Sequence, residues 1–318
     1  MSAWLLTVII VAGACFALWL VSHIVEALRP SPDSPAALRW APEIPVGYVD
    51  VGGARLRFIK MGAGPTIVLL HTLRTQLDLF ERMIPGLSKR FTVYALDYPG
   101  HGYSDIPQVR YDATFFANAV EGFLHKLDLR DVTLAGVSIG GVIPLIVAAR
   151  RNPRVVRVVS VNPYDYAKGL GMARSSLFGS MTTYASLIPV IGETVMRLRS
   201  FIVMRPILQG GVADPASISP ALMAEMYAVG NRPRHYGAFI NLIRNAESWE
   251  LAQQDYGRVQ VPVLLIFGDK DWSRPLERER TRSLIPNVVM KTVRSGGHFL
   301  PLDRPRELSE LITQFAGE

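Results

Sequence analysis

The most apolar part of the chain is a run near its N-terminus that contains no charged side chain. It extends from Trp4 to Val25, which is 22 residues. A helix of that length rises about 33 Å and matches the ~30 Å hydrocarbon core of a bilayer. Secretory signals have a shorter apolar region, of about 7–15 residues, after a basic start, whereas this chain opens with Met1-Ser2-Ala3. We therefore expect an uncleaved transmembrane anchor over residues 1–28 that contacts the membrane through residues 4–25. A cleaved signal and a buried core helix are the alternatives.

Charges and prolines after this run predict how the rest of the chain is joined to it. Arg29 and Arg39 follow the apolar run, and only the α-amino group precedes it. By the positive-inside rule this bias favours a single-pass membrane protein whose C-terminal part lies on the cytoplasmic side. Residues 29–45 are expected to form a stiff, extended linker, because they contain Pro30, Pro32, Pro35, Pro42 and Pro45.

Beyond the linker, short aliphatic segments alternate with helical ones. Residues 46–51 and 54–59 alternate like the two strands of a hairpin around Gly52-Gly53. Further strands are expected at 66–71, 91–97, 132–138, 155–161, 262–268 and 288–294. Helices are expected at 77–88, 112–127, 140–151, 276–285 and 304–316. This order predicts an α/β fold over residues 46–318, with a mostly parallel central sheet covered by helices on both faces.

The interval from about 165 to 255 interrupts this alternation. It contains helix-like stretches rich in Met, Leu, Ile and Tyr, separated by prolines. A long helical insertion between two strands of a sheet is typical of a lid over the strand ends. The alternative is that these helices form another part of the core.

Composition and charge exclude several classes of protein. The 318 residues are 49% hydrophobic and 19% charged, which describes a folded chain. The net charge of +7 comes from scattered basic residues, without zinc-finger spacing or a basic helix, so we expect no nucleic-acid partner. The single cysteine, Cys15, lies inside the apolar run. A disulfide scaffold and a cysteine-ligated metal are therefore excluded.

The strongest local motif for chemistry is Gly136-Val137-Ser138-Ile139-Gly140. It lies between an expected strand and an expected helix. A nucleophile on such a tight turn needs small neighbours, and the helix N-terminus stabilises negative charge that develops nearby. In this strand–turn–helix setting the motif predicts that Ser138 is a nucleophile. An ordinary glycine-rich turn is the alternative.

A serine nucleophile needs a base and a carboxylate that orients the base. His298 lies between the last expected strand and the last helix, and the other five histidines lie in less suitable segments. Asp271 follows the expected strand 262–268 and is the preferred acid, with Asp165 as a backup. The resulting order Ser138, Asp271, His298 is the order of α/β hydrolases. A structural role for His298 in a surface loop is the alternative.

From about residue 46 onward the chain resembles the α/β-hydrolase superfamily, in its lidded branch of esterases, lipases and carbon–carbon hydrolases. The resemblance is carried by four motifs in the expected order: 70–73, 97–105, the serine turn, and the Asp271/His298 pair. It implies an oxyanion hole formed by the backbone N–H groups of Leu73 and Ile139. It also implies that His71 and Asp97 support loops. The chain departs from the family at Thr72, where glycine is usual.

The nucleophile narrows the reaction that the resemblance implies. Haloalkane dehalogenases and epoxide hydrolases carry aspartate at the position of Ser138, whereas a serine requires an acyl carbon to attack. The anchor and the apolar insertion favour a lipophilic substrate. We expect a membrane-anchored serine hydrolase of lipophilic carboxylic esters. Alternatives are C–C bond or amide hydrolysis, acyl transfer or perhydrolysis on the same fold, and a non-catalytic binding protein. No metal or other cofactor is expected, because no H-E-x-x-H, G-x-G-x-x-G or P-loop motif is present.

Overall fold

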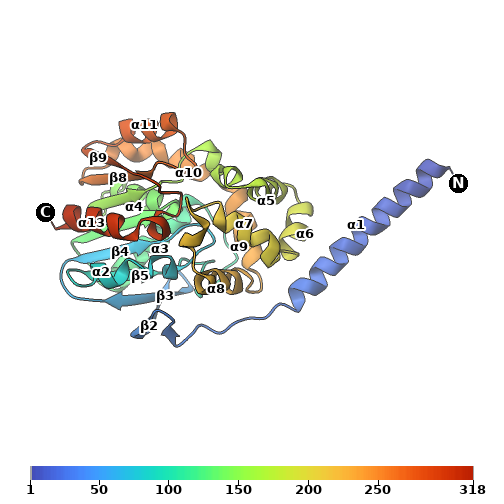
Figure 1. Ribbon diagram of the computed structural model, residues 1–318, viewed down its shortest axis with the longest axis horizontal. Coiled ribbons are helices and arrows are strands. Elements are labelled where there is room, and N and C mark those ends of the chain that lie inside the picture. The colour runs from blue at the N-terminus through green and yellow to red at the C-terminus, as the bar shows by residue number, and fades with distance from the viewer. Residues whose placement is uncertain (1, 318) are drawn as a thin grey trace.

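The aliphatic segments of the chain pair into one sheet of nine strands (Figure 1). The structure is a computed structural model that describes residues 2–317. The strand order is β1-β2-β3-β5-β4-β6-β7-β8-β9. Pairing is parallel from β5 through β4 to β9, and antiparallel among β1, β2, β3 and β5. This is the mostly parallel sheet that the sequence predicts. The bounds are β1 Ala37–Leu38, β2 Ala41–Val51, β3 Ala54–Met61, β4 Thr66–Leu70, β5 Thr92–Leu96, β6 Val132–Val137, β7 Val155–Val161, β8 Val263–Gly268 and β9 Val288–Val293.

The sheet begins earlier than expected, inside the segment proposed as a linker. β1 pairs with β2, which starts at Ala41. Leu38 and Ala41 are buried, and the indole N–H of Trp40 donates a 2.7 Å hydrogen bond to Asp78. These apolar side chains give residues 37–45 a place on the sheet edge, which a count of prolines does not reveal.

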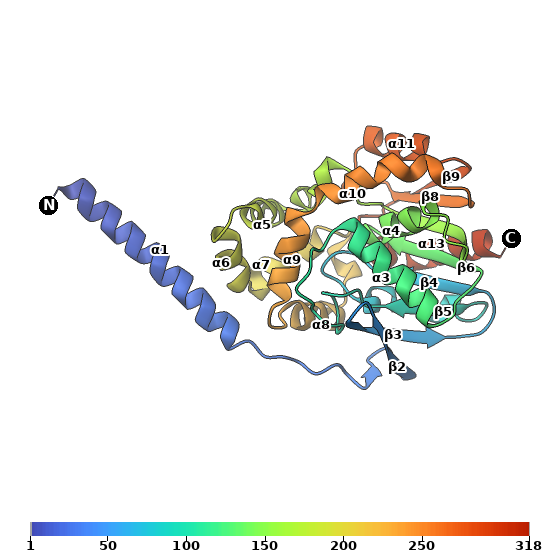
Figure 2. The same ribbon diagram turned by 180° about the vertical axis from the view of Figure 1, so that it is seen from behind.

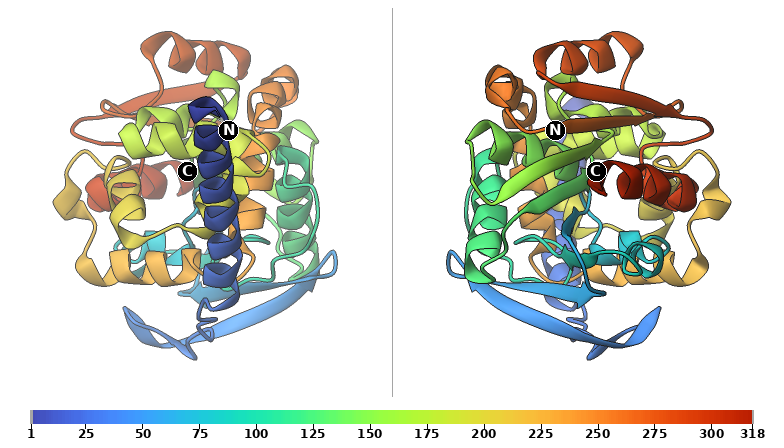
Figure 3. Two further views of the ribbon diagram at one scale, coloured as in Figure 1. Left: turned by 90° about the vertical axis from the view of Figure 1, so that its right-hand side faces the viewer. Right: turned by 90° about the vertical axis from the view of Figure 1, so that its left-hand side faces the viewer.

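Helices cover both faces of the sheet. Their bounds are α2 Ile84–Leu87, α3 Ala113–Lys126, α4 Ile139–Ala149, α11 Pro275–Leu284, α12 Leu300–Asp303 and α13 Pro305–Ala316. Figure 3 shows α3 on one side of the sheet and α2 with α13 on the other. The expected helix at 77–88 is divided into a 3₁₀ turn, Leu77–Phe80, and α2. Pro85 explains the division, since proline lacks an N–H and fits the first turn of a new helix.

Alternation along the central strands divides the core into two halves. In β4, Val68 and Leu70 belong to the cluster that contains residues of α3 and α4. Ile67 and Leu69 belong to the cluster that contains residues of α2 and α13. Successive strand residues point to opposite faces, so continuous apolar runs are needed where both faces are covered.

Between β7 and β8 the chain forms a helical insertion. It contains α5 Leu177–Leu187, α6 Ile191–Arg197, α7 Phe201–Gln209, α8 Pro220–Gly230, α9 His235–Arg244 and α10 Glu247–Leu251, together with short 3₁₀ turns. Figures 1 and 2 show α5, α6 and α7 at the end of the molecule that lies nearest the N-terminal helix.

The N-terminal helix α1, Ala3–Ala27, extends away from the sheet (Figure 2). Within residues 2–317 it is the one helix with the length and hydropathy, 2.5 on average, of a membrane span. A signal sequence at this end of a chain has the same properties. The C-terminal end of α1 is attached to the insertion. Glu26 accepts 2.8 Å and 3.0 Å hydrogen bonds from Arg199 and the backbone N–H of Arg234, and Arg29 donates a 2.9 Å bond to the carbonyl of Arg199.

A buried ion network fixes the loops beside the strand ends. Arg57 on β3 is fully buried and lies 3.3 Å from Asp78 and 3.2 Å from Asp97. Burial acts to lower the pKa of Arg57, but the charges of Asp97 and Asp78 outweigh it and raise the pKa. Asp97 also accepts hydrogen bonds from the backbone N–H groups of Leu77, at 2.7 Å, and Tyr103, at 2.9 Å.

Replacing Arg57 by methionine should therefore strongly destabilise the protein. Breaking a buried pair leaves its partners charged and uncompensated, which costs about 3–5 kcal/mol. Urea unfolding of Arg57→Met would measure this loss. The control is Arg110→Met, which removes an exposed arginine that pairs with Asp112 and should change the unfolding free energy by less than about 0.5 kcal/mol. Equal effects of the two substitutions would contradict this role for Arg57.

Candidate active site

Ser138 lies on a sharp turn between the end of β6 and the start of α4. Its backbone has φ 64° and ψ −122°, a conformation that residues other than glycine rarely adopt. Such strain costs about 1–3 kcal/mol and tends to persist at functional sites. The turn is held by hydrogen bonds from the Ser138 N–H to the Val161 carbonyl at 2.9 Å and from the Tyr164 N–H to the Ser138 carbonyl at 3.2 Å.

Two glycines allow this turn to form. A Cβ atom on Gly136 would lie 1.9 Å from the carbonyl oxygen of Gly140. A Cβ atom on Gly140 would lie 2.2 Å from the carbonyl oxygen of Leu70 on β4. Both contacts are with backbone atoms that cannot move aside. The glycines of the motif are therefore required by the close approach of α4 to the neighbouring strands.

The structure brings Ser138, His298 and Asp271 together. Nε2 of His298 lies 2.8 Å from Oγ of Ser138, and Nδ1 lies 2.5 Å from Oδ1 of Asp271. With Nδ1–H donating to the carboxylate, Nε2 carries a lone pair and accepts the serine hydroxyl proton. All three side chains are buried. This arrangement can transfer a proton from the serine to the imidazole during nucleophilic attack.

The surroundings of Asp271 keep it ionised. Burial acts to raise the pKa of its carboxyl group, but His298, by its charge and hydrogen bond, and Ser273, by two hydrogen bonds, outweigh burial and lower the pKa. The Ser273 donors are its hydroxyl and its backbone N–H, the latter at 2.9 Å. A carboxylate that stays charged can stabilise the imidazolium.

Asp165, the backup acid of the sequence analysis, is not placed beside His298. Both of its carboxylate oxygens accept from the hydroxyl of Thr281, at 3.0 and 3.1 Å. Burial raises the pKa of Asp165 to about 7. The position next to Nδ1 of His298 is occupied by Asp271 instead.

Two residues that shape the site were missed by sequence reasoning. Trp272 stacks on the imidazole of His298, with ring centres 3.9 Å apart and planes 12° from parallel. Asn162, at the end of β7, donates to the carbonyls of Gly297 and His298 at 2.9 and 3.0 Å and accepts from the N–H of Gly268 at 2.9 Å. It thus connects the strand that precedes Asp271 to the His298 loop. A polar residue at the end of a buried strand was the available signal.

The loop after β4 lies beside Ser138. His71 donates from Nδ1 to the Thr72 carbonyl at 2.8 Å, and its Nε2 accepts from the N–H of Tyr98 at 3.3 Å. Burial lowers the pKa of His71 to about 3, so the ring is neutral and supports the loop. Thr72 does not have a positive φ, which in this loop falls on Arg74. Glycine's conformational freedom is therefore not required at the position where this chain has threonine.

The N–H groups of Leu73 and Ile139, expected as oxyanion donors, are free of hydrogen bonds to protein acceptors within residues 2–317. Ile139 is the first residue of α4, where N–H groups have no intrahelical partner. Leu73 lines the same cavity as Ser138. Free donors beside the serine are what an oxyanion hole requires.

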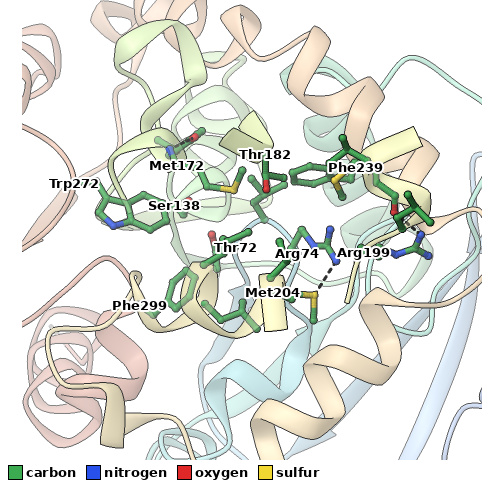
Figure 4. A pocket seen from close by; sticks show the side chains of 18 residues that line it. Thr72, Arg74, Ser138, Met172, Thr182, Arg199, Met204, Phe239, Trp272 and Phe299 are labelled. Atoms are coloured by element: carbon green, nitrogen blue, oxygen red, sulfur yellow. Dashed lines mark hydrogen bonds between the residues drawn. The ribbon is translucent and has the colours of Figure 1, made fainter. Parts of the chain in front are cut away.

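A cavity of about 250 Å³ opens between Ser138 and the helical insertion (Figure 4). Its walls are mostly apolar side chains from α6, α7 and α9 and from the loops after β4, β8 and β9. The apolar lining residues include Leu73, Met172, Val195, Met196, Leu198, Val203, Met204, Ile207, Leu208, Phe239, Trp272 and Phe299. No cluster of potential metal ligands was found among residues 2–317.

The fold and the site correspond to a known family. A model of the alpha/beta hydrolase fold matches residues 65–305, which is more than half of the 318 residues. The chain therefore belongs to the α/β-hydrolase family. A solved structure of Cfl2 from Burkholderia cenocepacia has a TM-score of 0.76 and covers 90% of this chain and 99% of its own. At 23% identity this likeness shows the fold alone.

Curated relatives have several activities. An uncharacterized protein of Mycobacterium tuberculosis is 26% identical over 278 residues, which is 83% of this chain and 79% of the relative. The 2-(acetamidomethylene)succinate hydrolase of Mesorhizobium japonicum is 28% identical over 264 residues, 76% of this chain and 94% of that enzyme. Epoxide hydrolases and a carboxylesterase also match. Family membership thus indicates a hydrolase without selecting the reaction.

Asn162→Ala should weaken the site by releasing the His298 loop. The substitution removes three hydrogen bonds, each with a net value of about 1 kcal/mol. We expect the rate at which a fluorophosphonate probe modifies Ser138 to fall roughly 10-fold or more. Asn118→Ala, at an exposed bond to Arg150, is the control and should label at the wild-type rate. An unchanged rate in a folded Asn162→Ala protein would show that the loop does not depend on this side chain.

Proposed function

We propose that this protein is a membrane-anchored serine hydrolase that cleaves lipophilic carboxylic esters through an acyl-enzyme. The observation that carries the proposal is the hydrogen-bonded series Ser138–His298–Asp271 at the wall of an apolar cavity. A serine attacks an acyl carbon, and esters are the acyl compounds that a Ser-His-Asp triad cleaves with the least further assistance. A carboxylesterase among the relatives is consistent with this chemistry.

The proposed reaction has two stages. Oγ of Ser138 attacks the acyl carbon while Nε2 of His298 takes the hydroxyl proton, and Asp271 stabilises the imidazolium. The N–H groups of Leu73 and Ile139 hold the oxyanion. Collapse of the tetrahedral intermediate expels the alcohol, which receives the proton from His298. Water, deprotonated by His298, then attacks the acyl-enzyme. Collapse of this second tetrahedral intermediate releases the acid, and His298 returns the proton to Oγ of Ser138.

The preference for a lipophilic acyl or alcohol group follows from the cavity. Its lining is dominated by aliphatic, thioether and aromatic side chains, and each buried CH₂ group of a ligand contributes about 0.8 kcal/mol. The insertion at about 165–255, which forms much of the wall, is proposed to act as a lid. Residues 1–28 form the anchor in this proposal, 29–45 connect it, and 46–318 form the hydrolase domain.

A membrane location is supported by the surface of the insertion as well as by α1. Apolar side chains on α5, α6 and α7 and at the start of α6 are exposed, including Leu177, Phe178, Met181, Tyr184, Leu187, Val190, Ile191, Val195, Phe201 and Ile202. This apolar face is near the end of α1, since Glu26 bonds to Arg199, which lies between α6 and α7. The domain is proposed to lie on the cytoplasmic side, with this face against the bilayer.

Substitutions in the proposed triad test whether it cleaves esters. Ser138→Ala should abolish hydrolysis of 4-nitrophenyl esters and labelling by a fluorophosphonate, with the wild-type melting temperature retained. Asp271→Asn should lower kcat by about 10³–10⁴-fold, because the imidazole takes the wrong tautomer. Asp165→Asn is the matched control and should lower kcat far less. A wild-type protein that is folded but not labelled at Ser138 would support a binding protein instead of an enzyme.

Lipid contact tests the orientation of the apolar face. A Cys15→Ser background allows a single environment-sensitive fluorophore at Ile202→Cys, a position that is 79% exposed on α7. In nanodiscs, spin-labelled lipids should quench this fluorophore. Leu276→Cys on α11, 85% exposed, is the control and should not be quenched. Equal quenching at the two positions would contradict a bilayer-facing surface on the insertion.

A further inference from the structure

Two charged side chains line the apolar cavity, Arg74 and Arg199, and of these two only Arg199 pairs with a carboxylate among residues 2–317. Arg74 follows Leu73 in the loop after β4 and lines the same cavity as Ser138. In Figure 4, Ser138, Trp272 and Phe299 lie at one side of the cavity, and Arg74 and Arg199 lie at the other. A guanidinium without a carboxylate partner in a mostly apolar wall needs an explanation, because charged groups are costly to remove from water.

The neighbours of Arg74 are poor partners for a cation. Its Nη2 lies 3.0 Å from the sulfur of Met204 and 3.4 Å from the carbonyl oxygen of Gly230. The guanidinium also lies 5.0 Å from the centre of the Phe239 ring. A thioether is a weak acceptor, and the bond to the carbonyl is long. No carboxylate pairs with Arg74 within residues 2–317.

The acid that pairs with Arg199 at this end of the cavity also pairs with a second arginine. Glu26, at the end of α1, lies 2.8 Å from Arg199 and 3.0 Å from Arg29. One carboxylate thus serves two guanidinium groups, and Arg74 adds a third positive charge. Burial first, and then the charges of Arg199 and Arg29, lower the pKa of Arg74 to about 9. Arg74 therefore remains protonated near neutral pH and lacks a counter-ion.

The backbone of Arg74 is also unusual. Its φ is 58°, a left-handed conformation that glycine adopts more readily. Non-glycine residues held in this region are concentrated at ligand-binding and catalytic positions. The same cavity therefore contains two non-glycine residues with a positive φ, Ser138 and Arg74.

We propose that Arg74 binds an anionic oxygen group of the substrate, so that the preferred ester carries a carboxylate or phosphate in addition to its apolar chain. This inference rests on the proposed function and specifies its substrate class. Guanidinium groups bind both oxyanions through paired N–H donors. The ligand supplies the counter-ion that Arg74 lacks, while its ester group lies at Ser138 and its apolar chain fills the space between.

The test compares two matched series of 4-nitrophenyl esters on the full-length protein in detergent or nanodiscs. One series is the mono-esters of dicarboxylic acids from adipate to sebacate, and the other is the esters of monocarboxylic acids of equal chain length. The wild type should prefer at least one acid-terminated ester over its neutral counterpart in kcat/KM. If the wild type prefers no acid-terminated ester at any chain length, the assignment of a terminal carboxylate to Arg74 is wrong.

Substitution of Arg74 separates charge recognition from chemistry. Arg74→Met should lower kcat/KM for the preferred acid-terminated ester by about 10-fold or more, equivalent to about 1.4 kcal/mol. It should lower kcat/KM for the neutral ester by a smaller factor than for the acid-terminated ester, because the neutral ester has no group for the guanidinium to bind. Arg74→Lys keeps the charge and should retain part of the preference. Arg130→Met, an exposed arginine before β6, controls for the loss of one positive charge. A preference that survives in folded Arg74→Met would overturn the proposal.

Inhibition by unreactive anions distinguishes the two oxyanions. Alkyl carboxylates and alkyl phosphates of equal chain length should inhibit neutral-ester hydrolysis competitively, and the tighter series identifies the group that Arg74 binds. Inhibition should weaken about 10-fold in Arg74→Met. If both series inhibit no better than the matching alcohols, the anion site is refuted. Failure of the proposed function itself would look different, because neutral esters would not be cleaved and Ser138 would not react with a fluorophosphonate.

Discussion

The site depends on one strained turn, in which Ser138 is held at φ 64° between β6 and α4. The strain is tolerated because β6 is completely buried and paired on both sides by parallel strands. Gly136 and Gly140 let α4 approach the strand ends to distances that any Cβ atom would prevent. As a result the serine lies at the carboxyl ends of the parallel strands, next to the N-terminus of a helix whose first N–H groups are unpaired.

Parallel pairing brings distant parts of the chain together at these carboxyl ends of the strands. Ser138 and His298 are 160 positions apart in the chain and still lie within a hydrogen bond of each other. The loops after β6, β7, β8 and β9 are neighbours because those strands are neighbours. Asn162 makes this proximity specific, since it bonds to the strand before Asp271 and to the His298 loop together. One buried amide thereby links the strand before Asp271 to the loop that carries His298.

The charges at the cavity connect the N-terminal helix α1 to the candidate active site. Glu26 at the end of α1 pairs with Arg29 and Arg199, and Arg199 lines the cavity. Glu26 is partly buried, so removal of either cation would leave its carboxylate less well compensated. The helix that is proposed to enter the membrane therefore also contributes to the electrostatics of the cavity, where Arg74 is left without an acid.

The sequence by itself determined the alternation of strands and helices, the serine turn with its glycines, and the choice of His298, because each depends on local periodicity, local sterics or chain order. It preferred Asp271 to Asp165 as the acid without showing which carboxylate faces the histidine, and it missed the first strand, the role of Asn162 and the unpaired state of Arg74. Only the tertiary structure decided these points. Which carboxylate meets an imidazole, and which arginine lacks one, depends on side-chain directions across strands and helices far apart in the chain, and no local pattern encodes those directions.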